Sequence, residues 1–151
     1  MEQTFKKIIK ELLITDTLKL SGKSFSDEII LSEYLQCSVL GEINFFNCNF
    51  EDVDFTGSNF INCTFENCTL KTSIFWKSEF WECRFKNCKI FACTLRKLDF
   101  YGGSFINCQF QKIDFRAMYF QDFKFLDPEF KKCVFDKYFK EDLKNFGNKN
   151  K

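Results

Sequence analysis

A large apolar residue returns at every fifth position over most of this chain. From Phe45 to Phe135 the period holds 19 times in succession, on 16 phenylalanines, two leucines and one isoleucine. Neither the 3.6-residue period of a helix nor the 2-residue period of a strand gives this spacing. The pattern predicts a chain that turns a corner every fifth residue.

A second inward position stands two residues before the first. It is mostly small, whereas the other three positions of the period are largely polar. Between residues 48 and 93 its occupants are Cys48, Val53, Ser58, Cys63, Cys68, Ser73, Ser78, Cys83, Cys88 and Cys93. The large position fills the interior and the small one lets the corners close, so we expect these cysteines to act as small hydrophobes.

The five-residue motif resembles that of the pentapeptide-repeat family. It is clearest in Cys63-Thr-Phe-Glu-Asn67 and Cys83-Arg-Phe-Lys-Asn87, which replace the alanine and leucine of the usual consensus by cysteine and phenylalanine. The resemblance covers at least residues 41–135. It implies an all-β solenoid, a right-handed four-sided β-helix with 20 residues per coil.

Residues 20 apart should then lie above one another, and they share their chemistry. Three expected columns are Phe45, Phe65, Phe85, Phe105 and Phe125; Phe60, Phe80, Phe100 and Phe120; and Cys48, Cys68, Cys88 and Cys108. An asparagine precedes each cysteine of the third column, at positions 47, 67, 87 and 107. Stacked amides can hydrogen-bond along the axis at the strand spacing of ~4.8 Å.

The chain is expected to form one domain over residues 1–151, with a helix at each end. A helical apolar stripe, Phe5, Ile8, Ile9, Leu12 and Leu13, predicts an N-terminal capping helix within residues 1–16. Residues 136–151 are interpreted as a C-terminal helix and tail, because open terminal coils expose unpaired edges. Residues 17–40 should form an irregular first coil, since Glu28 and Glu33 take the small inward position; a short helix over residues 26–36 is the alternative.

Composition excludes several classes of protein. Twenty-two basic against 21 acidic residues imply no bulk attraction to nucleic acid or to an anionic membrane. No apolar run approaches the ~20 residues of a membrane span, and residues 1–14 are too charged for a secretory leader, so we expect a cytoplasmic protein. Nine cysteines without a CxxC pair, and no histidine, predict reduced thiols and neither metal nor cofactor.

Catalysis finds no support in the sequence. There is no histidine, no serine beside a base and no glycine-rich phosphate loop. Glu79 and Glu82 are close in sequence, but a convex solenoid wall offers no pocket that would raise the pKa of one carboxyl. We therefore expect a protein that is not an enzyme.

The outward residues suggest where the protein binds. The side centred on Phe60, Phe80 and Phe100 carries five acidic residues from position 40 onward and neither lysine nor arginine. Together with aromatic residues they form a candidate interaction face for a protein partner: Glu42, Glu79, Trp81, Glu82, Asp99, Tyr101, Tyr119 and Asp122. The alternative is that these aromatics cover their own solenoid wall.

The opposite side, the Trp76 column and the C-terminal helix are three further surfaces of interest. Lysines on the opposite side (Lys71, Lys89, Lys112, Lys131 and Lys132) are interrupted by Glu51, Asp52 and Glu129, so direct nucleic-acid binding is not expected. Trp76 should stack over Arg96 and Arg116 as a cation–π ladder. A homodimer would use Phe139, Leu143 and Phe146 of the C-terminal helix.

The family resemblance also implies an alternative function. Some pentapeptide-repeat proteins mimic duplex DNA, bind type II topoisomerases such as gyrase and protect them from quinolones. The unbroken rod, the acidic side and the C-terminal helix agree with that role, whereas the balanced net charge does not. The sequence therefore favours an interaction module with an unidentified protein partner, with topoisomerase binding and quinolone resistance as the alternative.

Overall fold

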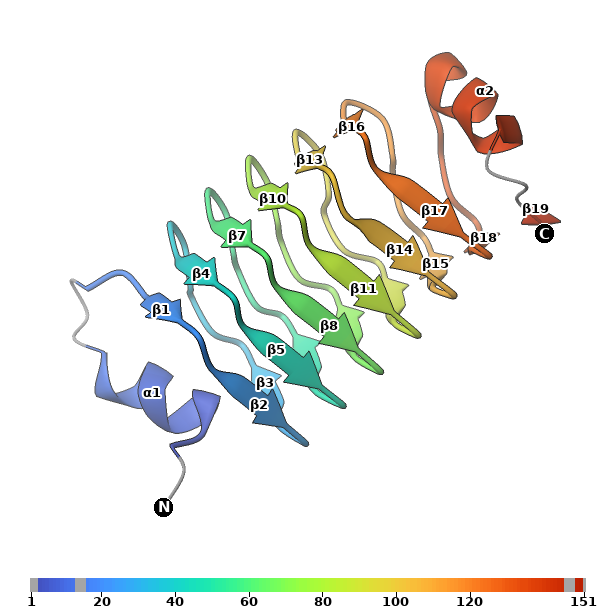
Figure 1. The fold of residues 1–151 in the computed structure, drawn as a ribbon. Helices are drawn as coiled ribbons and strands as arrows, with labels where there is room; N and C mark the ends of the chain where they lie inside the picture. The colour runs from blue at the N-terminus through green and yellow to red at the C-terminus, as the bar shows by residue number, and fades with distance from the viewer. Residues whose placement is uncertain (1–2, 13–15, 146–148, 151) are drawn as a thin grey trace.

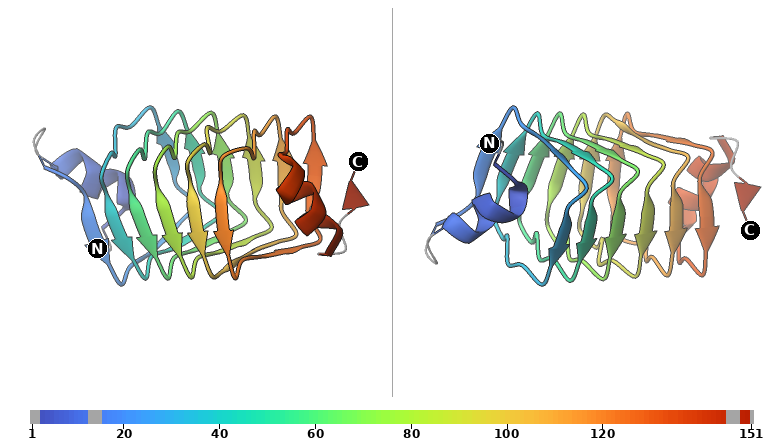
Figure 2. Two further views of the ribbon diagram at one scale, coloured as in Figure 1. Left: turned by 90° about the horizontal axis from the view of Figure 1, so that it is seen from above. Right: turned by 90° about the horizontal axis from the view of Figure 1, so that it is seen from below.

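Parallel β-sheets wrap around a common axis and form a solenoid, with a short helix at each end (Figure 1). The computed structural model describes residues 3–12, 16–145 and 149–150. The two views of Figure 2 place helix α1 and helix α2 at opposite ends of the solenoid. Among the described residues, no helix is long and apolar enough to cross a membrane.

Three sheets form three sides of the solenoid. The first contains β1 (Lys19–Ser21), β4 (Val39–Gly41), β7 (Asn59–Ile61), β10 (Glu79–Trp81), β13 (Asp99–Tyr101) and β16 (Tyr119–Gln121). The second contains β2 (Ser24–Ser26), β5 (Asn44–Phe46), β8 (Thr64–Glu66), β11 (Arg84–Lys86), β14 (Ser104–Ile106) and β17 (Lys124–Leu126). The third contains β3 (Ile29–Leu31), β6 (Asn49–Glu51), β9 (Thr69–Lys71), β12 (Lys89–Phe91), β15 (Gln109–Gln111), β18 (Glu129–Lys131) and β19 (Lys149–Asn150).

The register confirms the 20-residue coil. Phe80 pairs with Phe60 on one side and with Phe100 on the other, and every other strand pair keeps the same offset. The fourth side has turns and isolated parallel bridges in place of strands, for example Asp54 with Ile74. Three sheets and this bridged side together confirm the four-sided β-helix.

The aromatic columns also agree with the prediction. The rings of Phe60 and Phe80 stack at 4.4 Å between centroids, and Phe80 stacks on Phe100 at 5.1 Å. In the second sheet, Phe65 and Phe85 stack at 4.7 Å. These rings are almost completely buried, so dispersion and apolar burial hold successive coils together.

The inward cysteines connect neighbouring coils. The Cys88 thiol lies 3.2 Å from the carbonyl oxygen of Phe65, and the Cys108 thiol lies 3.4 Å from that of Phe85. The same contact recurs wherever a cysteine takes the small inward position, always with a carbonyl 23 residues earlier. A small side chain with a weak S–H donor therefore satisfies a backbone acceptor of the previous coil.

Each corner requires a left-handed backbone conformation. The residue two positions after the central apolar residue has a positive φ, between 48° and 60° at non-glycine corners. Asparagine tolerates this conformation better than most residues, which gives the asparagines a second reason for their position. The expected amide ladder is present where Asn107 Nδ2 donates to Asn87 Oδ1 at 2.8 Å; Asn47 Nδ2 donates to Asp27 Oδ1 at 2.6 Å.

The first coil corrects the sequence interpretation. Strands β1, β2 and β3 pair in register with β4, β5 and β6, so the coil is regular, and the alternative helix over residues 26–36 does not form. The first coil can be regular because the inward carboxylate of Glu28 is hydrogen-bonded. This carboxylate accepts hydrogen bonds from the backbone N–H groups of Phe5 (2.8 Å) and Lys6 (2.9 Å) at the start of α1 (Phe5–Glu11), so this inward charge has partners.

Both ends of the interior are closed by a phenylalanine from a helix. Phe5 of α1 packs against Phe25 and Phe45, with ring centroids 5.1 and 5.2 Å apart. At the other end, Phe139 of α2 (Lys137–Asn145) lies 5.2 Å from the ring of Phe115. Side chains from the helices thus continue the aromatic core beyond the last coils.

One coil departs from the small-inward rule. Gly103 occupies this position with φ +85°, and a Cβ atom there would lie 2.1 Å from the carbonyl oxygen of Cys83. One coil later the same position holds Phe123, whose ring lies 4.6 Å from Phe100 and 5.1 Å from Phe105, the central residues on either side of Gly103. The Phe123 ring thus packs against these two central residues of the coil that contains Gly103.

The aromatic columns predict a large cost for removing one ring. Phe80→Ala should lower the free energy of unfolding by ~3–5 kcal/mol, because it opens a cavity between two stacked rings. The outward substitution Gln109→Ala should have little effect. Chemical denaturation of both variants measures the difference, and equal losses would contradict the column assignment.

The backbone at Gly103 predicts a severe defect from a single methyl group. Gly22 is a matched control, because it has φ +67° but nothing within 4 Å of its added Cβ. Gly22→Ala should cost only the left-handed strain of ~1–2 kcal/mol. Gly103→Ala should cost clearly more, because its Cβ meets backbone that cannot move freely. Thermal unfolding compares the two, and similar melting temperatures would refute the close approach.

Candidate interaction face

The strands β10 and β13 bring five of the predicted face residues together. Parallel pairing places Glu79 beside Asp99 and Trp81 beside Tyr101, while Glu82 follows at the corner. We call these five residues the acidic-aromatic cluster. The stack of coils therefore converts a 20-residue sequence spacing into direct side-chain contact.

The aromatic rings of the cluster form a stacked pair. Trp81 and Tyr101 have centroids 4.1 Å apart and an angle of 18° between their planes. The Trp81 Nε1–H donates to Glu79 Oε2 at 2.9 Å, and the Tyr101 hydroxyl lies 3.5 Å from Asp99 Oδ2. These contacts hold the rings and carboxylates in fixed positions, although Trp81 remains 41% exposed.

The electrostatics show uncompensated negative charge. Partial burial raises the pKa of the Asp99 carboxyl above its usual value, and the like charge of Glu79 raises it further. The pKa of Tyr101 is raised first by desolvation and then by the Asp99 and Glu79 carboxylates. A positive group placed here would relieve both effects.

Glu82 lies over a glycine that the sequence analysis did not single out. A Cβ atom at Gly102 would lie 2.1 Å from Glu82 Oε1, so the carboxylate occupies the space above this glycine. Gly102 is also at a corner with φ +64°. The consecutive glycines 102 and 103, within a repeat otherwise poor in glycine, were the signal that could have indicated a close approach.

The other predicted face residues lie at the margin of the cluster or away from it. Tyr119 is exposed, and its ring lies 5.8 Å from that of Tyr101. Glu42 lies two coils away, separated by the neutral corner residue Asn62 in the same column. Asp122 takes the corner one coil beyond Gly102. The first sheet also begins with Lys19 on β1, so the acidic character is confined to its later coils.

The side next to the cluster carries positive charge. Lys77 Nζ lies 4.6 Å from the centre of the Trp76 ring, and Lys97 Nζ lies 6.0 Å from it. The predicted stack of Trp76 with two arginines is therefore wrong. Arg116 instead pairs with Asp114, through Nε to Oδ1 at 2.9 Å and Nη2 to Oδ2 at 2.8 Å, a bidentate geometry that fixes its guanidinium group.

One of the predicted dimer contacts, Phe139, is not available on the surface. Phe139 is 6% exposed and packs inside the C-terminal cap, against the rings of Phe115 and Phe120. It is buried because the last coil has no further coil to cover it. Leu143 belongs to α2, but its side chain and the whole of Phe146 lie outside the described parts of the structure.

The opposite side is a mixed surface. Lys71 pairs with Glu51 at 3.3 Å, and Lys112 Nζ lies 5.4 Å from the centre of the Phe91 ring. These lysines are thus partly neutralised or engaged by their own neighbours. The geometry agrees with a solvated side better than with a phosphate-binding strip.

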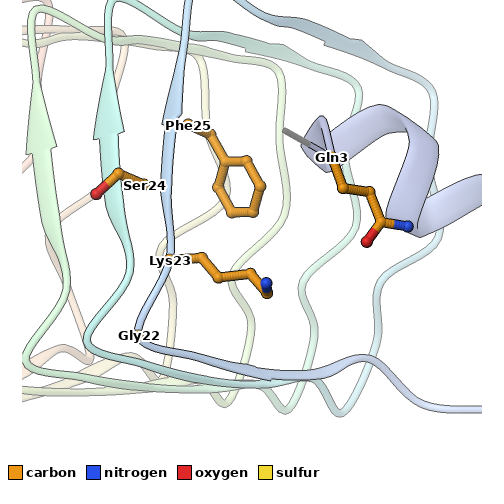
Figure 3. Close-up of a pocket in the computed structure, with 5 residues that line it drawn as sticks. All are labelled: Gln3, Gly22, Lys23, Ser24 and Phe25. Carbon is orange, nitrogen blue, oxygen red and sulfur yellow. The ribbon is translucent and has the colours of Figure 1, made fainter. Parts of the chain in front are cut away.

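A hollow at the N-terminal end offers no catalytic arrangement. It has a volume of about 330 Å³ and lies between Gln3, which precedes α1, and the first coil, where Gly22, Lys23, Ser24 and Phe25 line it (Figure 3). One lysine without a neighbouring acid or base cannot form an acid–base pair. Within residues 3–12, 16–145 and 149–150, no group of three or more potential metal ligands is found.

Comparison with known proteins identifies the repeat. A family profile described as pentapeptide repeats (9 copies) matches residues 45–89. Residues 45–89 therefore contain pentapeptide repeats. No curated protein sequence matches it.

Solved structures of QnrB1, a plasmid-mediated fluoroquinolone resistance protein, resemble this protein. One trypsin-treated variant has a TM-score of 0.42 at 16% identity, covering 80% of this chain and 75% of that chain. A second has a TM-score of 0.42 at 14% identity, covering 76% of each chain. Likeness at this level carries no argument about a partner.

The thiols of this protein differ in solvent exposure. All nine cysteines are free. Burial raises the pKa of the Cys93 thiol to about 12, so this group stays protonated and unreactive at neutral pH. Cys37 is the exception to the expected inward orientation, because it occupies an exposed corner with φ 56°.

Alkylation tests this division. In the native protein, iodoacetamide should modify Cys37 first, followed by the partly buried Cys133, while the buried thiols stay unmodified. In denaturant all nine should react. Intact mass and peptide mapping give the order. Rapid native modification of Cys93, or a thiol protected in denaturant, would contradict the assignment.

Proposed function

We propose that this pentapeptide-repeat protein is a non-enzymatic binding module that recognises a basic segment of a partner protein. The recognition surface is the acidic-aromatic cluster. The observation that carries the proposal is the stack of the exposed Trp81 on the half-buried Tyr101, bordered by the Glu79 and Asp99 carboxylates. Among the described residues, no cation forms an ion pair with these carboxylates.

The chemistry of the cluster suits arginine or lysine side chains. A guanidinium can stack on an aromatic face and also donate to a carboxylate. The stacked rings supply contact area, and the two neighbouring carboxylates supply charge-assisted acceptors. A basic segment would also reduce the repulsion between Glu79 and Asp99, which acts on the Asp99 pKa in the free protein.

The fold lowers the cost of binding. The cluster stands on strands that pair on both sides, β10 with β7 and β13, and β13 with β10 and β16. Internal hydrogen bonds already fix Trp81 against Glu79. A pre-ordered surface loses little conformational entropy when a partner binds.

A matched pair of variants tests the proposal. The first neutralises the cluster with Glu79→Gln, Glu82→Gln and Asp99→Asn. The control makes the same change in net charge elsewhere, with Glu33→Gln, Asp127→Asn and Glu141→Gln. Wild type and control should capture the same partner from a native lysate, and the cluster variant should lose it. The partner should associate with wild type faster at low salt, because charge steering is screened beyond ~8 Å at physiological ionic strength.

The outcomes separate the possibilities clearly. A partner whose binding site is a basic segment, lost only with the cluster variant, supports the proposal. If that partner is a type II topoisomerase subunit, it is the partner that the family resemblance implies. If all three proteins capture the same set, the cluster is ordinary solvated surface and the proposal fails.

A further inference from the structure

Two strips of opposite charge run along one corner of the solenoid. The acidic strip consists of Glu79 and Asp99 on β10 and β13. The basic strip consists of Lys77 and Lys97, two residues earlier in each coil and at corner positions with φ 56°. Between them lie Ser78 and Leu98, which are buried. The strips therefore flank the same edge on adjoining sides.

The strips do not neutralise each other within the chain. Lys77 and Lys97 extend toward the Trp76 ring, whereas Glu79 accepts from Trp81 and Asp99 interacts with Tyr101. The ion pairs formed by Glu51, Glu66 and Asp114 lie elsewhere. Each strip thus keeps its charge on a rigid ladder, with the two lysines exposed and the two carboxylates half-buried.

Symmetry determines which contact between two copies would match these charges. Consider two copies of the solenoid in contact through this edge of each copy. A two-fold axis parallel to the solenoid axis places the acidic strip of each copy opposite the basic strip of the other. A two-fold axis perpendicular to the solenoid axis places acid against acid and base against base, which is repulsive.

The aromatic residues follow the same arrangement. Trp76 lies farther from the edge than Lys77 on one side, and Trp81 lies farther from it than Glu79 on the other. Both indoles are 41% exposed. The parallel two-fold therefore brings Trp76 of each copy toward Trp81 and its stacked partner Tyr101 in the other, with the charges nearer the axis.

We propose that the chain forms a side-by-side parallel dimer through this edge, with the basic strip of a second copy as a ligand of the acidic-aromatic cluster. This inference rests on the proposed function, because it names one basic partner for the same cluster. It differs from the dimer expected from the sequence, which used the C-terminal helix.

Charge exchange between two variants tests the dimer. One variant carries Glu79→Lys and Asp99→Lys, and the other carries Lys77→Glu and Lys97→Glu. The fold accommodates these residues, since Lys89 and Lys19 stand at positions equivalent to Glu79, and Glu42 and Glu82 take corner positions with φ 54° and 50°. Each variant alone should dimerise at least about tenfold more weakly than wild type, because like strips then face each other.

An equimolar mixture of the two variants should restore the dimer. Every facing pair of strips is again of opposite charge, so the mixture should contain only mixed dimers by native mass spectrometry. A control with Lys89→Glu and Lys132→Glu makes the same charge change as the second variant on the opposite side. This control should keep the wild-type dimer in sedimentation velocity over a concentration series.

Three results would overturn the dimer. They are a wild type that stays monomeric at high micromolar concentration, variants that dimerise as wild type does, and a mixture that fails to recover the dimer. The proposed function is tested separately, because the Lys77→Glu, Lys97→Glu variant keeps the cluster intact. If this variant captures the lysate partner while wild type is monomeric, the dimer proposal is wrong and the proposed binding function is retained.

Discussion

Every part of this molecule depends on the exact superposition of coils 20 residues apart. Backbone hydrogen bonds connect each strand to the strands before and after it, and the same offset stacks Phe60, Phe80 and Phe100 in the interior. The two interactions require one another. A slip of one residue would move the apolar central residues out of the interior and place outward, largely polar residues at the inward positions.

The same superposition organises the outside. The neighbours of each outward residue are fixed by the coil, because each residue lies between the residues 20 positions before and after it. Glu79 meets Asp99 and Trp81 meets Tyr101 for this reason alone. A charged or aromatic column is therefore a property of the whole stack, and a rigid surface with one chemistry arises without a pocket.

The ends and the exceptions show how the repeat tolerates irregular residues. Glu28 points inward where a small residue is expected, and two N–H groups of α1 satisfy its carboxylate. Phe123 is larger than the usual occupant of its position, and its ring packs against Phe100 and Phe105 of the previous coil. In both cases contacts with neighbouring residues accommodate the irregular side chain, so the register continues unchanged.

The five-residue period of the sequence determined which residues face inward. Together with the 20-residue coil that the family resemblance implies, it also determined the columns and the side on which acidic residues gather, because these follow from counting positions. Only the tertiary structure decided the contacts that depend on side-chain direction and on chain segments far apart. Counting sequence positions could not show that Phe139 closes the core or that the Glu28 carboxylate caps the N-terminus of α1. Nor could it show that Lys77 and Lys97, rather than arginines, contact the Trp76 ring. The reason is physical: a period fixes which face a residue occupies, whereas partners are chosen by packing and charge once the coils and their caps are in place.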